Sequence, residues 1–201
     1  SGKWNSRDAG TKAEAEMSCI MFLWMRTPSV SERYKPSPLI SSMVTFIAAY
    51  HYIRVFNSCE EAYHYHAAKE GVPQQPEITG IPFNDAYRYM DWLLTVPLLL
   101  MEIVLVMNLP PEEANSQCWS LGVFSALMIV SGYKGELVVS GNLSPRWVSW
   151  FISMMFFSYV VYTLLIGLAD ATNSEPDKKV KSMLKNAQVV TCVSWCTYPI
   201  V

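Results

Sequence analysis

Asp91 and Glu102 are two carboxyl residues inside one strongly apolar stretch of the chain. Their positions differ by 11. On an α-helix that spacing ends within about 20° of a whole number of turns, so both carboxyl groups lie on one face, about 16 Å apart along the axis. Arg88 and Thr95 lie one turn to either side of Asp91 on the same face. Ionisable groups are costly in apolar surroundings, so this set is a candidate for function.

The arrangement suits the movement of a proton in one direction. Asp91, kept ionised by Arg88, can accept a proton from a buried base, and Glu102 can resupply that base. A supplier must hold a proton at neutral pH, which burial among apolar side chains favours. Unequal protonation of two carboxyl groups is typical of separate acid and base roles. The spacing also fits an alternative, in which Glu102 faces a lipid headgroup and Arg88 forms a structural ion pair with Asp91.

His51 is the histidine most relevant to this set, because it lies in the preceding apolar stretch. A single buried histidine more often has a structural role, yet a histidine beside Asp91 could act as a proton switch near neutral pH. His64 and His66 lie in a polar loop without a third ligand at metal spacing. We therefore expect these two side chains to face solvent and to hold no metal.

Stretches without charge predict the elements that position these residues. A bilayer core about 30 Å thick is crossed by about 20 mostly apolar residues in a helix, and several segments approach this length. The alternative is a buried helix bundle in a soluble protein, but soluble helices have a polar face, and residues 147–169 have none. We predict an all-α membrane protein with a polar tail at 1–12, a transmembrane domain at 13–201, and helices at 13–27, 37–58, 83–108, 116–133, 146–168 and 181–201.

The composition narrows the class of protein further. Of the 201 residues, 51% are hydrophobic and 16% are charged, with a net charge of −2. So much apolar surface would collapse, which disfavours disorder, and the charge balance without a basic patch disfavours nucleic-acid binding. Lysine and arginine are more frequent in the loops 26–36 and 169–185 than in the loops on the opposite side. This bias predicts that these two loops are cytoplasmic and that the N-terminus lies outside.

The third predicted helix resembles a known motif. Residues 88–102, RYMDWLLTVPLLLME, resemble the third helix of microbial rhodopsins, above all the proton pumps of the proteorhodopsin and xanthorhodopsin group. The resemblance covers about residues 36–201 and implies a seven-helix bundle around retinal. Further segments resemble that group in the same order: AAYHYIRVFNS (48–58), FNDAYRY (83–89), SGYKGE (131–136), RWVSWFIS (146–153) and SWCTYP (194–199).

The resemblance implies a role for each residue of the set. Asp91 would be the counter-ion and proton acceptor of a retinal Schiff base, Thr95 its hydrogen-bond neighbour, and Glu102 the cytoplasmic proton donor. His51 would be the partner of the acceptor, and Arg88 would control the outward side. The retinal would lie against flat, apolar and small side chains, as a polyene requires. These are Trp92, Leu99, Met128, Gly132, Trp150, Ser153, Phe157, Trp195, Tyr198 and Pro199.

Two of these positions also imply which pigments the protein holds. Leu99 resembles the position that separates green from blue absorbers in this group, where an apolar residue goes with green absorption. Trp150 stands where relatives with a carotenoid antenna have a glycine that opens a window onto the retinal ring. Because an indole would fill that window, we expect no carotenoid antenna and retinal as the only pigment.

One departure from the family is large. Microbial rhodopsins carry the retinal-binding lysine on a seventh helix, and none of the nine lysines of this chain lies within an apolar span. We therefore expect a partial sequence of a light-driven outward proton pump, not an enzyme. We expect it to form homo-oligomers in the bilayer of a plasma or internal membrane of a microbial eukaryote. The alternatives are a photosensory rhodopsin that signals to a partner, which Glu102 disfavours, and a chromophore-free membrane scaffold.

Overall fold

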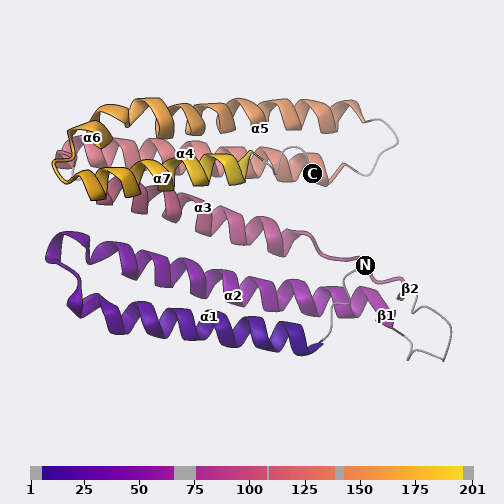
Figure 1. The fold of residues 1–201 in the computed structure, drawn as a ribbon. Helices are drawn as coiled ribbons and strands as arrows, with labels where there is room; N and C mark the ends of the chain where they lie inside the picture. Colours follow the sequence, from indigo (N-terminus) through magenta and orange to yellow (C-terminus); the bar gives the residue numbers. More distant parts are fainter. Residues whose placement is uncertain (1–5, 66–75, 108, 139–142, 197–201) are drawn as a thin grey trace.

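The computed structural model describes residues 6–65, 76–107, 109–138 and 143–196. Its long helices are α1 (Ser6–Arg26), α2 (Pro36–Ala62), α3 (Ala86–Val106), α4 (Pro111–Glu136), α5 (Ser144–Tyr162) and α7 (Lys178–Trp195). They lie side by side and run alternately in opposite directions (Figure 1). α3 is central, because it packs against both α2 and α4, while α1 packs on α2 and α5 packs on α4. The predicted all-α bundle is confirmed.

Three segments of the described chain are long and apolar enough to cross a membrane. They are α2, α3 and the segment Ser144–Ser174, which begins with α5. Large apolar side chains are exposed on these segments, for example Phe46, Leu94 and Phe151. Such a surface suits contact with lipid, since soluble proteins rarely expose contiguous apolar patches of this extent. The chain is therefore an integral, multi-pass membrane protein.

Several helices begin earlier than the apolar pattern predicts. α1 begins at Ser6 and so extends into the predicted polar tail, because the Ala, Lys and Glu residues of 9–16 are strong helix formers. α4 begins at Pro111, with two glutamates in its first turn that complement the helix dipole. α7 begins at Lys178, because the Asp177 side chain accepts a hydrogen bond from the Lys179 backbone N–H at 2.7 Å. Hydropathy locates the apolar part of a helix and misses its polar ends.

The predicted fifth helix, 146–168, is interrupted near its end. α5 gives way to a π-helical turn, η3 (Thr163–Gly167), which is followed by the short helix α6 (Ala169–Ser174). The Leu168 N–H donates to the Thr163 carbonyl oxygen at 3.0 Å, five residues back instead of four. Because hydropathy carries no information on hydrogen-bond register, the sequence predicts neither this turn nor the helix in the polar segment after it.

The connections at the two ends of α2 contain short regular elements. The 3₁₀ turns η1 (Thr27–Ser29) and η2 (Glu32–Tyr34) join α1 to α2. Between α2 and α3, where the sequence predicts only a loop, β1 (Tyr63–Tyr65) pairs antiparallel with β2 (Pro76–Ile78). Thr79 anchors this hairpin to the end of α2, since its backbone N–H donates to the Ala62 carbonyl oxygen at 3.1 Å.

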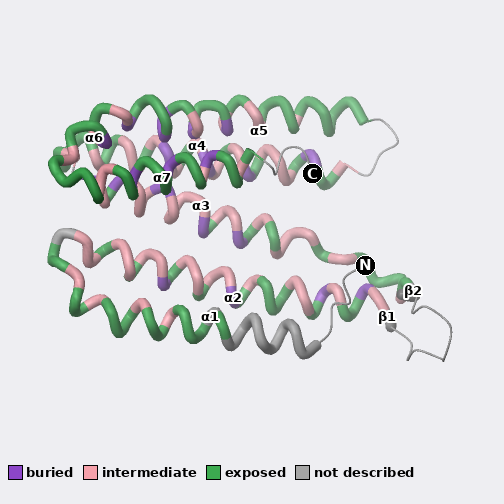
Figure 2. Tube along the Cα trace, in the orientation of Figure 1, coloured by how far each residue is buried: buried purple, intermediate pink, exposed green. Residues whose placement is uncertain are grey.

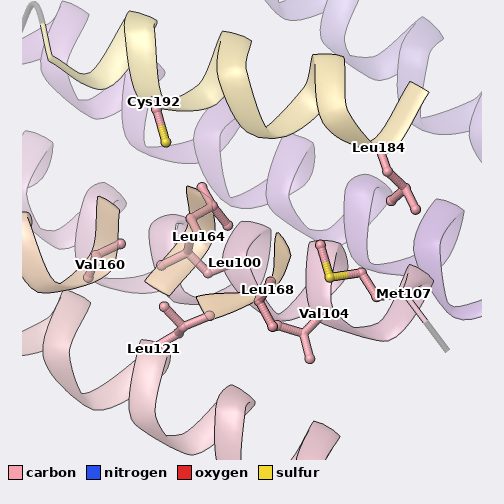
Figure 3. Close-up of a cluster of buried hydrophobic side chains, with 9 residues drawn as sticks. All are labelled: Leu100, Val104, Met107, Leu121, Val160, Leu164, Leu168, Leu184 and Cys192. Carbon is pink, nitrogen blue, oxygen red and sulfur yellow. The ribbon is translucent and has the colours of Figure 1, made fainter. Parts of the chain in front are cut away.

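A cluster of buried apolar side chains joins α3, α4, α7 and the end of the fifth span (Figure 3). By contrast, the outer faces of the helices are mostly exposed (Figure 2). The cluster consists of Leu100, Val104, Met107, Leu121, Val160, Leu164, Leu168, Leu184 and Cys192.

α3 has two faces of different chemistry. Leu100, Val104 and Met107 recur at helical spacing and form the face toward the apolar cluster. At 3.6 residues per turn, Asp91 and Glu102 project from roughly the opposite side of the helix. The apolar cluster therefore fixes the rotation of α3 and turns its carboxyl-bearing face toward the rest of the bundle.

Candidate functional site

Asp91 and Thr95 form the buried part of the site. Asp91 is 7% exposed and Thr95 is 6% exposed, one turn further along α3. The Thr95 hydroxyl donates to the backbone carbonyl oxygen of Asp91 at 2.8 Å. Asp91 and Thr95 are thus buried on the same face of α3, as predicted. The hydrogen bond of Thr95 goes to the Asp91 backbone and not to its carboxyl group.

Glu102 faces α2 and not a lipid headgroup. The hydroxyls of Ser37 and Ser41 both donate to its Oε1 atom, at 2.5 Å and 2.7 Å. The structure therefore disfavours the alternative interpretation of Glu102 as a headgroup contact. The sequence does not predict either serine as a partner, because each lies more than 60 positions from Glu102. The available signal was two hydroxyls at i and i+4 near the start of the helix that precedes the one bearing Glu102.

Arg88 has an ion-pair partner other than Asp91. Its guanidinium forms an ion pair with Asp85, one turn nearer the start of α3, and about half of its side chain is exposed. A long cationic side chain near the end of a membrane helix extends toward the aqueous side, which favours the partner closer to the surface. Arg54 on α2 has a similar position and lies over the Tyr87 ring, 5.0 Å from its centroid.

His51 lies on α2, the helix that packs against the carboxyl-bearing side of the bundle. Its Nδ1 atom is buried and has no hydrogen-bond partner among the residues that the structure describes. The ring makes an edge contact with Tyr50 at a centroid distance of 5.2 Å. A buried polar atom without a partner costs free energy, so this nitrogen is a candidate for an interaction that the described residues do not supply. The expected pairing of His51 with Asp91 stays a prediction.

Four of the predicted pigment-contacting residues meet where α3, α4 and α5 adjoin. The Ser153 hydroxyl donates to the Met128 carbonyl oxygen at 2.8 Å and so ties α5 to α4. A methyl group placed on Gly132 would lie 3.5 Å from the Ser153 Oγ atom and 3.9 Å from the Tyr89 ring. Trp92 is also near, because its ring lies edge-on to Tyr89 at 5.3 Å. These four residues, which come from three helices, therefore lie close together in the structure.

The remaining predicted contact residues have different environments. Phe157 is buried, and Trp195 packs against the apolar cluster. Trp150 is 37% exposed at the bundle surface, where its ring makes edge contacts with Trp147 and Phe151 at 5.9 Å and 5.1 Å. Leu99 is half-buried on α3. Tyr198 and Pro199 lie outside the described residues, as does His66.

This set fits the walls of a site for a flat polyene. Trp92 lies against Tyr89, Gly132 lies close to Ser153, Phe157 is buried, and Asp91 supplies a buried carboxyl group. The amine for a covalent link is not among them, because the nine lysines lie outside the apolar spans. Among the side chains that the structure describes, no group of three metal-ligating residues occurs.

Comparison with known proteins agrees with this geometry. Residues 11–201 match the family described as bacteriorhodopsin-like protein. The solved structure of xanthorhodopsin, described as a light-driven ion pump with dual chromophore, has a TM-score of 0.84 and 38% identity over 96% of this chain and 74% of that one. Thermophilic rhodopsin has a TM-score of 0.83 and 35% identity over the same shares.

A curated relative is the green-light absorbing proteorhodopsin of Gamma-proteobacterium EBAC31A08. It is 27% identical over 92% of this chain, which spans 66% of that protein's length. The fold, with the buried Asp91 carboxyl group on its central helix, defines a membrane protein of the microbial rhodopsin class. Since the family match covers nearly the whole sequence, the chain belongs to the bacteriorhodopsin-like family.

Proposed function

We propose that the full-length protein is a retinal-binding, light-driven outward proton pump. The observation that carries this proposal is the face of α3 opposite the apolar cluster, where Asp91 is buried and Glu102 accepts two hydrogen bonds from α2. The likeness to xanthorhodopsin, a light-driven ion pump, supports it. Retinal, held through a lysine outside these residues, would supply the light-absorbing centre.

Each residue of the site would have a role in proton transfer that depends on its position along α3. Asp91 accepts a proton in the buried part of the site, and Thr95 fixes the backbone that carries it. Arg88, paired with Asp85 near the start of α3, lies on the way from Asp91 to the outer surface. Glu102 holds the proton that resupplies the centre from the other side. Trp92 and its neighbours on α4 and α5 would enclose the pigment and keep water away from it.

The same proposal includes orientation and assembly. The lysines and arginines of the loops 26–36 and 169–185 favour an outside N-terminus, so α2 begins and α3 ends on the cytoplasmic side. We propose a homo-oligomer in the plasma membrane or an internal membrane of a microbial eukaryote. The exposed apolar side chains of α1 and α2 support contact with lipid or with neighbouring subunits.

Light-driven acidification of the medium tests the pump. Cells that express the full-length protein with all-trans retinal should acidify an unbuffered medium in light, and a protonophore should abolish the signal. Alkalinisation that a protonophore enhances would instead show transport of another ion. Colour without any pH change would favour the photosensor, and a colourless membrane would favour the scaffold.

Leu99 is expected to set the colour. In Leu99→Gln, a polar group beside the pigment stabilises its ground-state charge, so the absorption maximum should shift to the blue. Leu94→Gln is the matched control, because Leu94 is 44% exposed on α3 and faces outward. The absorption spectra of both variants measure the effect. A shift in Leu99→Gln no larger than in the control would contradict this role.

Trp150 is expected to prevent binding of a carotenoid antenna. With a ketocarotenoid added to the reconstituted full-length protein, the excitation spectrum of retinal emission should contain no carotenoid band. In Trp150→Gly the band should appear, because the indole at the bundle surface is removed. Trp147→Gly, a neighbouring exposed tryptophan on α5, should not produce it. A carotenoid band in the parent protein would show that the prediction is wrong.

A further inference from the structure

Ser37 and Ser41 contact the same atom of Glu102. They lie one turn apart on α2, and each hydroxyl donates to Oε1, at 2.5 Å and 2.7 Å. Two donors on one oxygen fix the direction of the carboxyl group and leave its second oxygen for other partners. The two serines differ in depth. Ser37 is in the first turn of α2, and Ser41 lies one turn further into the bundle.

The surroundings of Ser37 connect it to the aqueous surface. α2 begins at Pro36, which is exposed, and Ser37 itself is part-buried. The preceding 3₁₀ turn is polar, with an ion pair between Lys35 and Glu32 at 2.5 Å. Ser37 is therefore a hydroxyl with solvent on one side and the Glu102 carboxyl group on the other.

Between Glu102 and the end of α3 at Val106, the helix itself carries no hydroxyl or other proton-carrying side chain. One turn beyond Glu102, toward the end of the helix, stand Leu105 and Val106, and the buried Val104 and Met107 belong to the apolar cluster. Apolar side chains cannot carry a proton, because they offer neither a donor nor an acceptor. A proton that reaches Glu102 from this end of the bundle is therefore expected to arrive from the α2 side.

We propose that Ser37 is the residue through which protons from the cytoplasmic surface enter to reload Glu102, and that Ser41 is a positioning residue. In the step, the Ser37 hydroxyl passes its proton to a Glu102 carboxylate oxygen while its own oxygen takes a proton from water. One proton moves inward, Ser37 is regenerated, and the hydroxide left at the surface is neutralised by the bulk. This inference rests on the proposed donor role of Glu102.

The exchange of the Glu102 carboxyl proton for deuterium in the dark tests this entry route without requiring pumping. The C=O stretching band of Glu102 is identified in the infrared spectrum of the full-length protein by its loss in Glu102→Gln. Its shift after transfer to D₂O gives the exchange rate. Ser37→Thr and Ser37→Val form a matched pair, because both fill the same space and only Thr keeps a hydroxyl.

The Thr variant should exchange at the parent rate, and the Val variant should be slower on the order of a hundredfold, as expected when a positioned proton-transfer group is removed. Ser41→Val should move the C=O band to higher frequency through the lost hydrogen bond while its exchange stays near the parent rate. In light, Ser37→Val should delay proton uptake and leave proton release unchanged.

Equal exchange rates in Ser37→Thr and Ser37→Val would overturn the entry role of Ser37. Absence of a Glu102 C=O band in the parent would mean an ionised carboxylate and would overturn the donor role as well. Failure of the protein to pump, combined with slow exchange in Ser37→Val, would refute the proposed function alone and leave the entry route intact.

Discussion

Asp91→Asn should abolish light-driven acidification. The amide has nearly the shape of the carboxyl group, so the buried site on α3 keeps its packing, but a neutral amide cannot accept the proton. Loss of an essential proton acceptor costs on the order of 10²–10⁴-fold in rate, which places the variant below detection by a pH electrode. The measurement is made on cells with equal amounts of coloured protein.

Asp170→Asn is a suitable control, because Asp170 is exposed on α6 and far along the chain from the carboxyl-bearing face. It should acidify the medium as the parent does. Unchanged acidification in Asp91→Asn would refute its assignment as the acceptor. Loss of acidification in both variants would point to a general effect of the substitution on expression or assembly.

Glu102→Gln should slow recovery of the pigment after a flash, on the order of a hundredfold. Without the internal donor the proton must come from the bulk, so recovery should slow further as pH rises and proton concentration falls. Gln keeps the size of Glu, and its amide oxygen can still accept from Ser37 and Ser41, so the packing of α2 on α3 is retained.

Flash photolysis at several pH values measures this effect. Glu113→Gln is the control, because Glu113 is exposed in the first turn of α4. Its recovery should match that of the parent across the pH range. A Glu102→Gln variant with the same recovery and the same weak pH dependence as the parent would be incompatible with the donor role.

The carboxyl-bearing face of α3 is the part of the site that sequence predicts best. The positions of Asp91, Thr95 and Glu102 on one face depend only on helical periodicity, which is local. The structure keeps this periodicity and adds an apolar face on the opposite side, at Leu100 and Val104. For a long apolar helix, the sequence alone therefore predicts which polar residues share a face and how far apart they lie along the axis.

Contacts between helices were not predictable in the same way. The hydrogen bonds of Ser37 and Ser41 to Glu102 join residues that are 65 and 61 positions apart. The pairing of Arg88 with Asp85 instead of Asp91 depends on which rotamer the side chain adopts near the helix end. The serine contacts do not follow from spacing along one element. The Arg88 pair has helical i to i+3 spacing, but spacing alone does not decide between Asp85 and Asp91 as its partner.

The resemblance to a family predicts which residues on different helices come together, and helical periodicity does not. Met128 and Gly132 lie one turn apart on α4, but no spacing relates them to Ser153 on α5, which they meet in the structure. By contrast, hydropathy treated 146–168 as one helix and missed the π turn, because a change in hydrogen-bond register leaves the pattern of apolar residues nearly unchanged.

The π turn η3 has a consequence for insertions and deletions in this span. Its hydrogen bond from Leu168 to Thr163 closes over five residues, so the turn holds one residue more than an α-helical turn. Removing one exposed residue there, such as Leu165, would convert it to an ordinary α-helical turn and leave α6 facing as before. The same deletion within α5 would rotate everything after it by about 100° and turn the buried Leu164 and Leu168 away from their partners on α3 and α4 in the apolar cluster. Length variation among relatives of this protein is therefore expected to be tolerated at η3 and excluded from the regular helix before it.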